Sequence, residues 1–329
     1  ISGATALSFC EVFYRELLGG PTSVEAAVAA ARARLRVCSP GLSWASFCQY
    51  SGLDAHEEAR PLAIRPYRGL LAFEAAHARF FFGREAERDE ALRDLDALIA
   101  AGQPRFLIVS GASGTGKSSV VLAGVAPALA ARGMQIEVFR PGRDPLAALD
   151  AALARRRAER LVLVVDQFEE VFTHRGADVD AGSRFARRLW QLAGDRAVFT
   201  AVIVTLRIDY LGHCGELTLD DGVRLDRIAF AEVHRVLVPQ LARERLRDII
   251  ERPAEKVGLT LEKGLCDVLV EQSGGEAGAL PLLQYALDEL WAAREGSALT
   301  HAALDRLGGV VGALTRRADA VWEPLGEPE

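Results

Sequence analysis

Short apolar segments alternate with helical ones along the middle of the chain. The apolar segments are almost uninterrupted, as expected for strands covered on both faces of a sheet. They span residues 105–110, 135–139, 161–165, 198–205 and 233–237. Helices are predicted over residues 84–100, from 117 onward, and over 145–157 and 183–192. Strands that alternate with helices predict an α/β domain with a parallel sheet.

The flanks of this alternation have different patterns. After residue 237 the chain is predicted to be wholly helical, over residues 243–252, 261–271, 281–294 and from 300 onward. Before it, the pattern predicts helices over 4–18 and 24–36, a capping box from Thr22 to Glu25, and a strand over 44–50. Residues 51–65 lack periodicity and are interpreted as a linker. Pro127 is expected to end or kink the helix that begins at 117.

Composition narrows the classes of function. At 329 residues, half of them hydrophobic, the chain can form about two domains with real cores. The net charge of −6 gives no electrostatic footprint for nucleic acid, so nucleic acid is not expected as a partner. Five cysteines without a Cys-x-x-Cys pair favour a reducing, cytoplasmic compartment. No apolar run approaches the roughly 20 residues that span a bilayer, so no membrane association is expected.

The first strand leads directly into a glycine-rich loop that ends in Gly-Lys-Ser. Its three glycines allow backbone conformations closed to other residues, which turn successive N–H groups toward a phosphate. Lys117 supplies a charge for the β- and γ-phosphates and Ser118 a hydroxyl for Mg²⁺. A chance glycine turn is the alternative, but the strand before and the helix after it favour a nucleotide. The predicted phosphate-binding residues are Gly111, Ala112, Ser113, Gly114, Thr115, Gly116, Lys117, Ser118 and Ser119.

An acidic motif closes the strand over 161–165. Asp166 fits the Walker B role of holding Mg²⁺ together with Ser118, delivered by a strand beside the phosphate loop. Glu169 and Glu170 follow, and either could activate the water that attacks the γ-phosphate, with Glu170 slightly preferred. An ordinary acidic loop after a strand is the alternative. The upstream glycine loop favours the metal site.

A basic residue follows the strand over 198–205. Arg207 can sense the γ-phosphate, because arginine forms bidentate contacts with phosphate oxygens. From the residues alone, a surface salt bridge with Asp209 is an equally good interpretation.

Taken together, these motifs resemble those of STAND-type signalling NTPases, a bacterial group usually fused to propeller or other repeat sensors. The resemblance rests on residues 66–73, 80–85, 111–119, 123–129, 140–142, 165–170, 205–209 and 278–283, and it covers about 66–325. It implies ATP or ADP with Mg²⁺, a γ-phosphate sensor at Arg207, Pro281 near the adenine, and a segment 67–85 folded over the base. Because aromatic residues 80–82 are more typical of a core, Gly83 and Arg84 are the expected nucleotide neighbours. Pro281 could also be a simple helix-start proline.

The resemblance also implies a domain order. It predicts a parallel-sheet P-loop domain of the ASCE, AAA+-like type over 66–240, a helical lid over 241–298 and the truncated start of a winged helix over 299–329. Residues 1–50 resemble the C-terminal end of a caspase-like CHAT peptidase domain, a short α/β remnant in which Cys10 is expected to be a buried structural thiol. Because both ends look like cuts, effector and sensor domains are expected outside the chain.

These features predict an ATP/ADP-operated switch that controls an attached effector by opening and self-association, with slow hydrolysis. Two other classes stay open. An AAA+-like remodelling ATPase would need an arginine finger from a neighbouring subunit, for which Arg224 and Arg227 are candidates by position alone. A non-hydrolysing scaffold would keep ADP as a structural cofactor.

Overall fold

The computed structural model describes residues 3–19, 24–38, 45, 47, 64–174, 180–273 and 278–322. The chain forms two compact units, which we call the sheet unit and the helical unit. The sheet unit comprises residues 71–245 and 275–281, and the helical unit comprises residues 1–70, 246–274 and 282–329. The strand predicted over 44–50 and the linker predicted over 51–65 lie almost entirely outside the described residues, and the capping box at Thr22 begins outside them.

Five parallel strands form the centre of the sheet unit, in the order β2-β3-β4-β1-β5. The strands are β1 (Phe106–Gly111), β2 (Gln135–Phe139), β3 (Leu161–Val165), β4 (Thr200–Arg207) and β5 (Arg235–Leu237). The order confirms the predicted parallel α/β fold of the P-loop class. It corrects one detail, because β3, which leads into Asp166, is separated from β1 by β4 rather than lying beside it.

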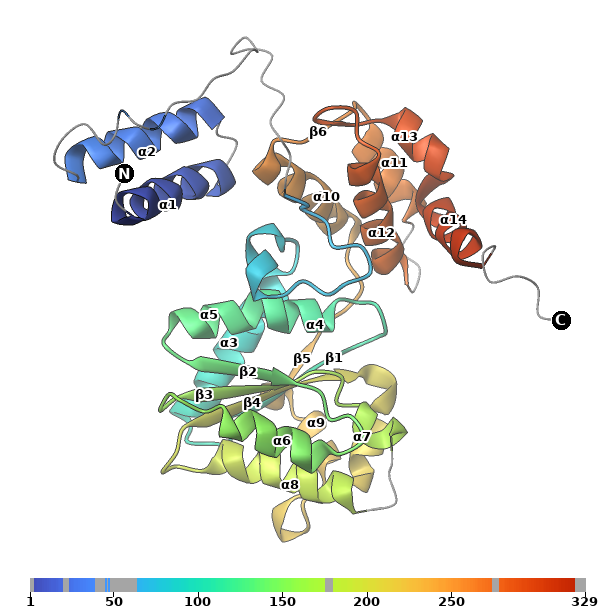
Figure 1. Ribbon diagram of the computed structural model, residues 1–329. Coiled ribbons are helices and arrows are strands. Elements are labelled where there is room, and N and C mark those ends of the chain that lie inside the picture. Colours follow the sequence, from blue (N-terminus) through green and yellow to red (C-terminus); the bar gives the residue numbers. More distant parts are fainter. Residues whose placement is uncertain are drawn as a thin grey trace. The chain divides into compact units, whose positions relative to one another are not determined.

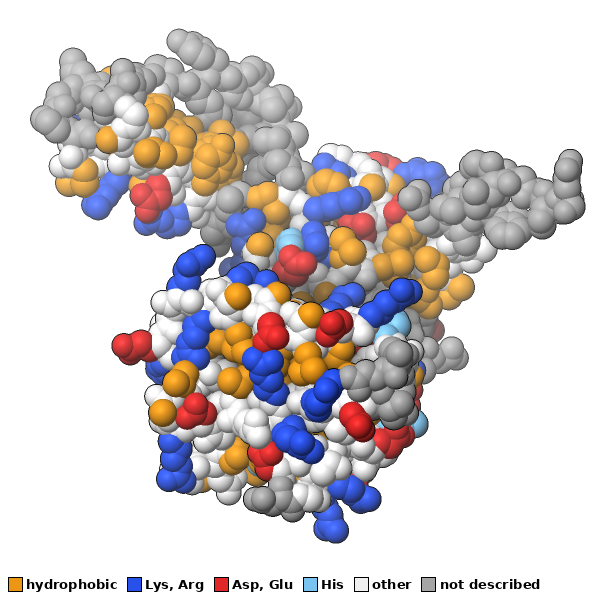
Figure 2. Space-filling view, turned by 60° about the horizontal axis from the view of Figure 1, so that its bottom comes forward, with side chains coloured by type: hydrophobic (Ala, Val, Ile, Leu, Met, Phe, Trp, Pro, Cys, Tyr) orange, Lys and Arg blue, Asp and Glu red, His pale blue; other side chains and the backbone are white. Residues whose placement is uncertain are grey.

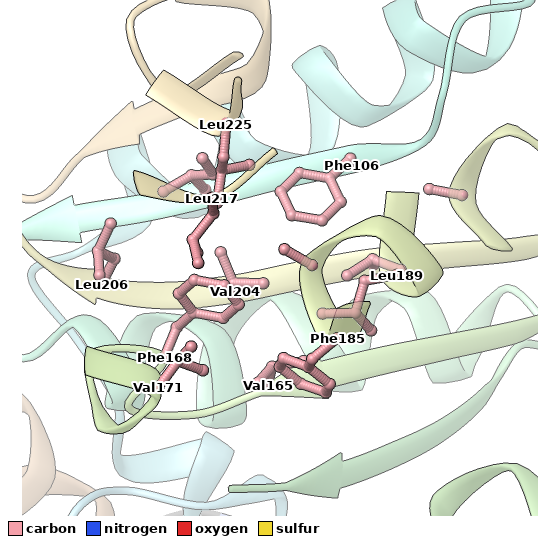
Figure 3. Packing of buried hydrophobic residues seen from close by; sticks show 14 of the residues in the cluster. Phe106, Val165, Phe168, Val171, Phe185, Leu189, Val204, Leu206, Leu217 and Leu225 are labelled. Carbon is pink, nitrogen blue, oxygen red and sulfur yellow. The ribbon is translucent and has the colours of Figure 1, made fainter. Parts of the chain in front are cut away.

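Helices cover both faces of this sheet (Figure 1). On one face, α3 (Glu85–Ala100) and α5 (Ala126–Ala131) pack over alternate strand residues such as Leu107 and Val109. On the other, α6 (Pro145–Ala154), α8 (Ala181–Gly194) and α9 (Leu225–Ala229) cover the opposite set. Figure 3 shows this second core, where Phe168 and Phe185 stack with ring centroids 6.0 Å apart. Burial on both faces explains why the inner strand β3 is apolar throughout, whereas the edge strand β2, which is only partly buried, also contains Gln135 and Glu137.

The helix after the phosphate loop is interrupted as Pro127 predicts. It begins as α4 (Lys117–Ser119), widens into a π-helical segment, η3 (Val120–Val125), and resumes as α5 with Pro127 near its start. Proline has no N–H to donate, so it is tolerated at the beginning of a new helical segment. The irregularity therefore lies before the proline.

The C-terminal part of the helical unit, as far as the structure describes it, contains five helices and a pair of very short strands. The helices are α10 (Arg243–Val257), α11 (Leu265–Gln272), α12 (Ala279–Ala292), α13 (His301–Leu307) and α14 (Gly309–Trp322), of which α10 and α12 begin in the sheet unit. The strands β6 (Thr260–Leu261) and β7 (Ala298–Leu299) pair in parallel, so the prediction of a wholly helical region is wrong at this point. Two-residue strands have too few positions to show a period.

Residues before the sheet unit also pack in this helical unit. The hydroxyl of Tyr67 donates to the carbonyl of Ile250 in α10 at 2.6 Å, and burial raises the pKa of the tyrosine. Pro253 lies inside the same helix and cannot donate to the carbonyl of Ile249. The helix was predicted to end at residue 252, but it continues to Val257 because its apolar face, including Ile249 and Ile250, is buried.

The first two helices form a hairpin, α1 (Gly3–Gly19) against α2 (Val24–Cys38). Phe9 packs with Leu35 in its core and stacks on Phe47 at a centroid distance of 3.9 Å. Cys10 is exposed, which corrects the expectation of a buried thiol. It follows Phe9 directly, and adjacent residues of a helix point in different directions, so only one of the two can face the hairpin core.

The sheet unit also contains shorter helices, which include η2 (Ala75–Phe80), α7 (Glu170–Thr173), η4 (Ile208–Tyr210), η5 (Gly212–Glu216), η6 (Asp220–Gly222) and η7 (Glu232–His234). Among the residues that the structure describes, no helix is both long and apolar enough to cross a membrane. Basic and acidic side chains are interspersed over the face shown in Figure 2 rather than separated by sign.

Candidate functional site

The phosphate loop joins β1 to α4 in a compressed turn. A Cβ atom on Gly111 would lie 2.4 Å from the Val238 carbonyl oxygen and 2.9 Å from Thr115 Oγ1, so only glycine fits there. Its φ is not in the left-handed region, so close approach rather than an unusual conformation requires this glycine. The loop does use the left-handed region at Gly114 and Gly116, with φ of +76° and +90°.

Lys117 lies at the start of α4 and is largely buried. Its Nζ donates to the carbonyl of Ala112 at 2.8 Å, within the phosphate loop itself. Burial lowers the pKa of this lysine, and the nearby carboxylate of Glu169 opposes that shift. The loop therefore holds a partly desolvated cation over its own backbone, where an anion would be bound strongly.

Ser118 and Asp166 meet at the ends of α4 and β3. The serine hydroxyl donates to Asp166 Oδ1 at 2.6 Å, and Asp166 is almost fully buried. Two oxygen groups this close suit Mg²⁺, which is usually held by one or two protein oxygens together with phosphates and water. The described residues contain no cluster of three His, Cys, Asp or Glu side chains that could hold a metal by themselves.

Thr205, in β4, orients this acidic group. Its Oγ1 donates to Asp166 Oδ1 at 2.8 Å and accepts from the Gln167 backbone N–H at 2.9 Å. Arg140 adds a guanidinium nitrogen 3.4 Å from Asp166 Oδ2. Thr205 was not predicted as a site residue. Its sequence signals are a hydroxyl near the end of an apolar strand and its place as the first residue of the 205–209 motif.

The turn after Asp166 has an unusual backbone. Gln167 has φ of +57°, and no other non-glycine residue in the described part of the chain has a positive φ. The bond from its N–H to Thr205 Oγ1 and the bond from Phe168 N–H to the Thr205 carbonyl (2.9 Å) hold this conformation. A left-handed residue here sharply changes the direction of the chain, and it determines where the two glutamates that follow are placed.

The two glutamates have different surroundings. Glu169 Oε2 accepts from the Arg207 backbone N–H at 3.4 Å, and burial raises the pKa of Glu169 while Lys117 and Arg207 lower it. Glu170 instead accepts from the Gly142 backbone N–H at 2.9 Å. Glu169 thus faces the cations of the phosphate loop, whereas Glu170 is held by the loop after β2.

Arg207 is paired with Asp209. Its Nε and Nη2 contact the two oxygens of Asp209 at 3.2 and 2.7 Å, and its guanidinium lies 5.5 Å from the ring centre of Tyr210. The strand register places Arg207 beside Gly111, the first residue of the loop. The ion pair of the second interpretation is present, and Arg207 lies at the phosphate loop, while its sensing of a γ-phosphate stays a prediction.

Pro281 packs against the same loop. A Cβ atom on Gly114 would come within 3.0 Å of Pro281 Cγ, and one on Gly116 would lie 3.6 Å from Leu280 Cδ2. Pro281 is the third residue of α12, where the absence of an N–H costs no intrahelical bond. It is an early helix proline that also contacts the phosphate loop.

Arg84 is buried and has a supporting role. Its Nη2 donates to the Thr115 and Pro239 carbonyls, both at 2.7 Å, and its Nη1 pairs with Glu87. Gly83, before it, is also buried, with φ of +79°. The guanidinium therefore connects the phosphate loop to the chain just after β5. Its expected place beside the nucleotide stays a prediction.

The segment over 71–82 lies against the helix that follows the loop. Ser119 Oγ accepts from the Phe73 backbone N–H at 3.1 Å, so this hydroxyl serves the segment rather than facing Asp166 as Ser118 does. A Cβ atom on Gly124 would lie 3.3 Å from the Phe81 ring. Phe80 is buried and Phe81 packs on the core, which agrees with a structural role for these aromatics.

A parallel sheet with a glycine-lysine-serine loop after β1 and a buried aspartate after β3 defines a P-loop NTPase. Residues 66–329 match the family model "Novel STAND NTPase 1", and the chain therefore belongs to that family. No curated protein matches the sequence.

Among solved structures, the chain is similar to the Holliday junction branch migration motor RuvB of Thermotoga maritima. The identity is 15%, the TM-score is 0.44, and the match covers 73% of this chain and 72% of RuvB. A mutant of the same motor matches at 16% identity with a TM-score of 0.44, covering 72% of this chain and 73% of the mutant.

Proposed function

We propose that this chain is the ATP/ADP-binding switch of a signalling NTPase and controls an attached effector through nucleotide-dependent opening and self-association. The observation that carries the proposal is the 2.6 Å contact between Ser118 and Asp166 beside the buried Lys117. The cation would bind the β- and γ-phosphates. Mg²⁺, when bound, would be held by Ser118 and Asp166 and would neutralise phosphate charge.

The same geometry supports slow hydrolysis with Glu169 as the base. Glu169 lies by the Arg207 backbone N–H and within electrostatic reach of Lys117, and burial raises the pKa of its carboxyl. A general base works best when its pKa lies near the operating pH, and a raised pKa brings the carboxyl closer to that range. Glu170 is engaged by Gly142 and would have a structural role.

The contact of Pro281 with Gly114 supports the proposal that the helical region responds to the nucleotide bound at the phosphate loop. In this proposal residues 66–240 bind the nucleotide, with adenine near Pro281, and 241–298 act as a lid. Residues 299–329 begin a winged helix. Residues 1–50 end a caspase-like CHAT domain, which would be the effector. The protein would act in the cytoplasm, with sensor domains elsewhere in a longer chain.

Two measurements separate this switch from the other classes. Denaturing the purified protein and identifying the released nucleotide should yield ADP. Hydrolysis of ATP should be slow, and its rate per chain should not rise with protein concentration. A remodelling ring would instead show a rate that rises steeply with concentration, because a neighbouring arginine completes each site. Arg224, a candidate finger by position, is paired with Asp226 at 2.7 Å.

A scaffold with structural ADP would show no hydrolysis, and its self-association would not differ between ATP and ADP. The switch requires such a difference, because a ligand can shift an equilibrium only by its differential affinity for the two states. Sedimentation of the full chain with each nucleotide tests this point. Equal sedimentation with ATP and ADP would contradict the switch.

A further inference from the structure

We propose that Asp209 sets the preference of this site between a nucleoside diphosphate and a nucleoside triphosphate, by holding Arg207 and by placing a negative charge near the position of the γ-phosphate. This inference rests on the proposed function, since it assumes that nucleotide binds at the loop. It assigns a role to a residue outside the phosphate loop and the acidic strand end.

Arg207 and Asp209 form a bidentate ion pair. Nε and Nη2 of the arginine each contact a separate carboxylate oxygen, at 3.2 and 2.7 Å. This edge of the guanidinium is one of those that match the two oxygens of a phosphate group. A phosphate and Asp209 therefore compete for the same donors.

Asp209 is also close enough to act on the phosphate-loop lysine. Lys117 lowers the pKa of Asp209, after the larger effect of Arg207, and Asp209 in turn favours the charged form of Lys117. The strand register supports this placement, because Arg207 lies beside Gly111 and Asp209 follows two residues later in η4. The carboxylate thus belongs to the charge cluster around the lysine that would receive the γ-phosphate.

The ion pair is exposed, and this determines how it can act. The side chains of Arg207 and Asp209 are 41% and 51% exposed, and ion pairs exposed to this degree contribute little to stability. A γ-phosphate can therefore displace the carboxylate from Arg207. The displaced carboxylate stays close to the γ-phosphate, and repulsion between the two negative charges lowers the affinity for the triphosphate. A diphosphate has no γ-phosphate to compete for Arg207, so in this proposal it is not repelled in this way.

An ordinary surface pair in the same unit provides a matched control. Arg132 and Asp96 are also in contact, at 2.9 Å, and their side chains are 41% and 53% exposed. Asp96 is not among the charges that act on Lys117. Asp96→Asn therefore removes an equally exposed paired carboxylate without changing the charge at the loop.

The test is competition binding of Mg-ATP and Mg-ADP against a fluorescent nucleotide, with the full chain and its Asp209→Asn and Asp96→Asn variants. Asp209→Asn should raise the ratio of ATP to ADP affinity about fivefold, the lower end of usual coupling between sites. Asp96→Asn should leave the ratio unchanged. Asp209→Ser, with a side chain that cannot pair bidentately, should reproduce the effect, and thermal melting checks that each variant is folded.

The outcomes separate this inference from the proposed function. If the wild type binds both nucleotides and the Asp209 variants keep its ATP to ADP ratio within twofold, the role of Asp209 is refuted while nucleotide binding stands. The same holds if Asp96→Asn changes the ratio equally. If the wild type binds neither nucleotide, the proposed function fails and this inference fails with it.

Discussion

Pro281 of α12 packs on Gly114 of the phosphate loop so closely that a side-chain carbon on the glycine would lie 3.0 Å from the proline ring. The two residues lie in the same compact unit although they are far apart in sequence. A rearrangement of the loop around a phosphate would therefore press on the first turn of α12. In the proposed switch, this contact would couple bound nucleotide to α12.

Gly114→Ala tests that contact. Gly114 and Gly133 have nearly the same φ, +76° and +79°, but a Cβ on Gly133 would meet nothing within 4 Å. Alanine at either position costs about 1 kcal/mol for the left-handed backbone. Gly114→Ala should cost about 1–3 kcal/mol more, because its methyl group overpacks against Pro281. Urea unfolding of both variants measures the difference, and equal losses of stability would show that the contact is unimportant.

Thr205→Val should weaken the metal-dependent part of nucleotide binding. The change removes the donor to Asp166 and the acceptor for the Gln167 N–H, which costs about 1–3 kcal/mol of stability for a buried unsatisfied group. Thr200→Val is the control, since Thr200 is buried at the other end of β4 and bonds Arg156 at 3.2 Å. Only Thr205→Val should reduce the gain in ATP affinity on adding Mg²⁺. If both variants respond to Mg²⁺ as the wild type does, Thr205 does not orient a metal ligand.

Glu169→Gln should lower the rate of ATP hydrolysis at least about a hundredfold, as expected for loss of a general base. Glu170→Gln should change it little, because a glutamine oxygen can still accept from Gly142. Single-turnover hydrolysis of bound ATP by both variants compares them directly. A larger loss in Glu170→Gln would reverse the assignment.

Arg84→Ala should unfold the sheet unit at lower denaturant concentration than the wild type. Removing the buried guanidinium leaves Glu87 and two backbone carbonyls without their hydrogen-bond donor. Loss of one partner from a buried pair lowers the free energy of unfolding by about 3–5 kcal/mol. Arg132→Ala, at an exposed pair, should cost only about 0–1 kcal/mol. Similar losses for the two variants would mean that Arg84 does not hold the loop to the chain after β5.

Local pattern was sufficient for most of the sheet. The strands Gln135–Phe139 and Leu161–Val165 were predicted with their observed bounds, because the first alternates polar and apolar residues at its start and the second is a continuous apolar run. At 233–237 the pattern failed in part. Residues 232–234 form a 3-10 turn in which His234 Nδ1 lies 2.7 Å from the Phe106 carbonyl oxygen, and only Arg235–Leu237 is a strand. That contact joins two distant segments and leaves no local signal.

The candidate site also contains residues that local motifs predict and residues whose roles depend on distant segments. The glycine loop and Asp166 were predicted because each is a local motif with a defined chemistry. The different surroundings of Glu169 and Glu170 were not predictable, since they depend on the left-handed Gln167, whose conformation is held by Thr205 of another strand. The link that Arg84 makes between the phosphate loop and the chain after β5 likewise depends on the carbonyls of Thr115 and Pro239, which lie far away in sequence. Side chains that organise a site across strands need the fold to be known.

The most direct test of the central claim is nucleotide binding by Lys117→Ala. Lys117 is the buried cation of the loop, while Lys256, in the last turn of α10, is exposed and provides the control. Isothermal titration of each full-length variant with Mg-ATP and Mg-ADP should show binding by the wild type and by Lys256→Ala, and a loss of at least about a hundredfold in affinity for Lys117→Ala, as expected when a desolvated charge contact to phosphate is removed. Binding of both nucleotides by Lys117→Ala as tightly as by the wild type would contradict the account.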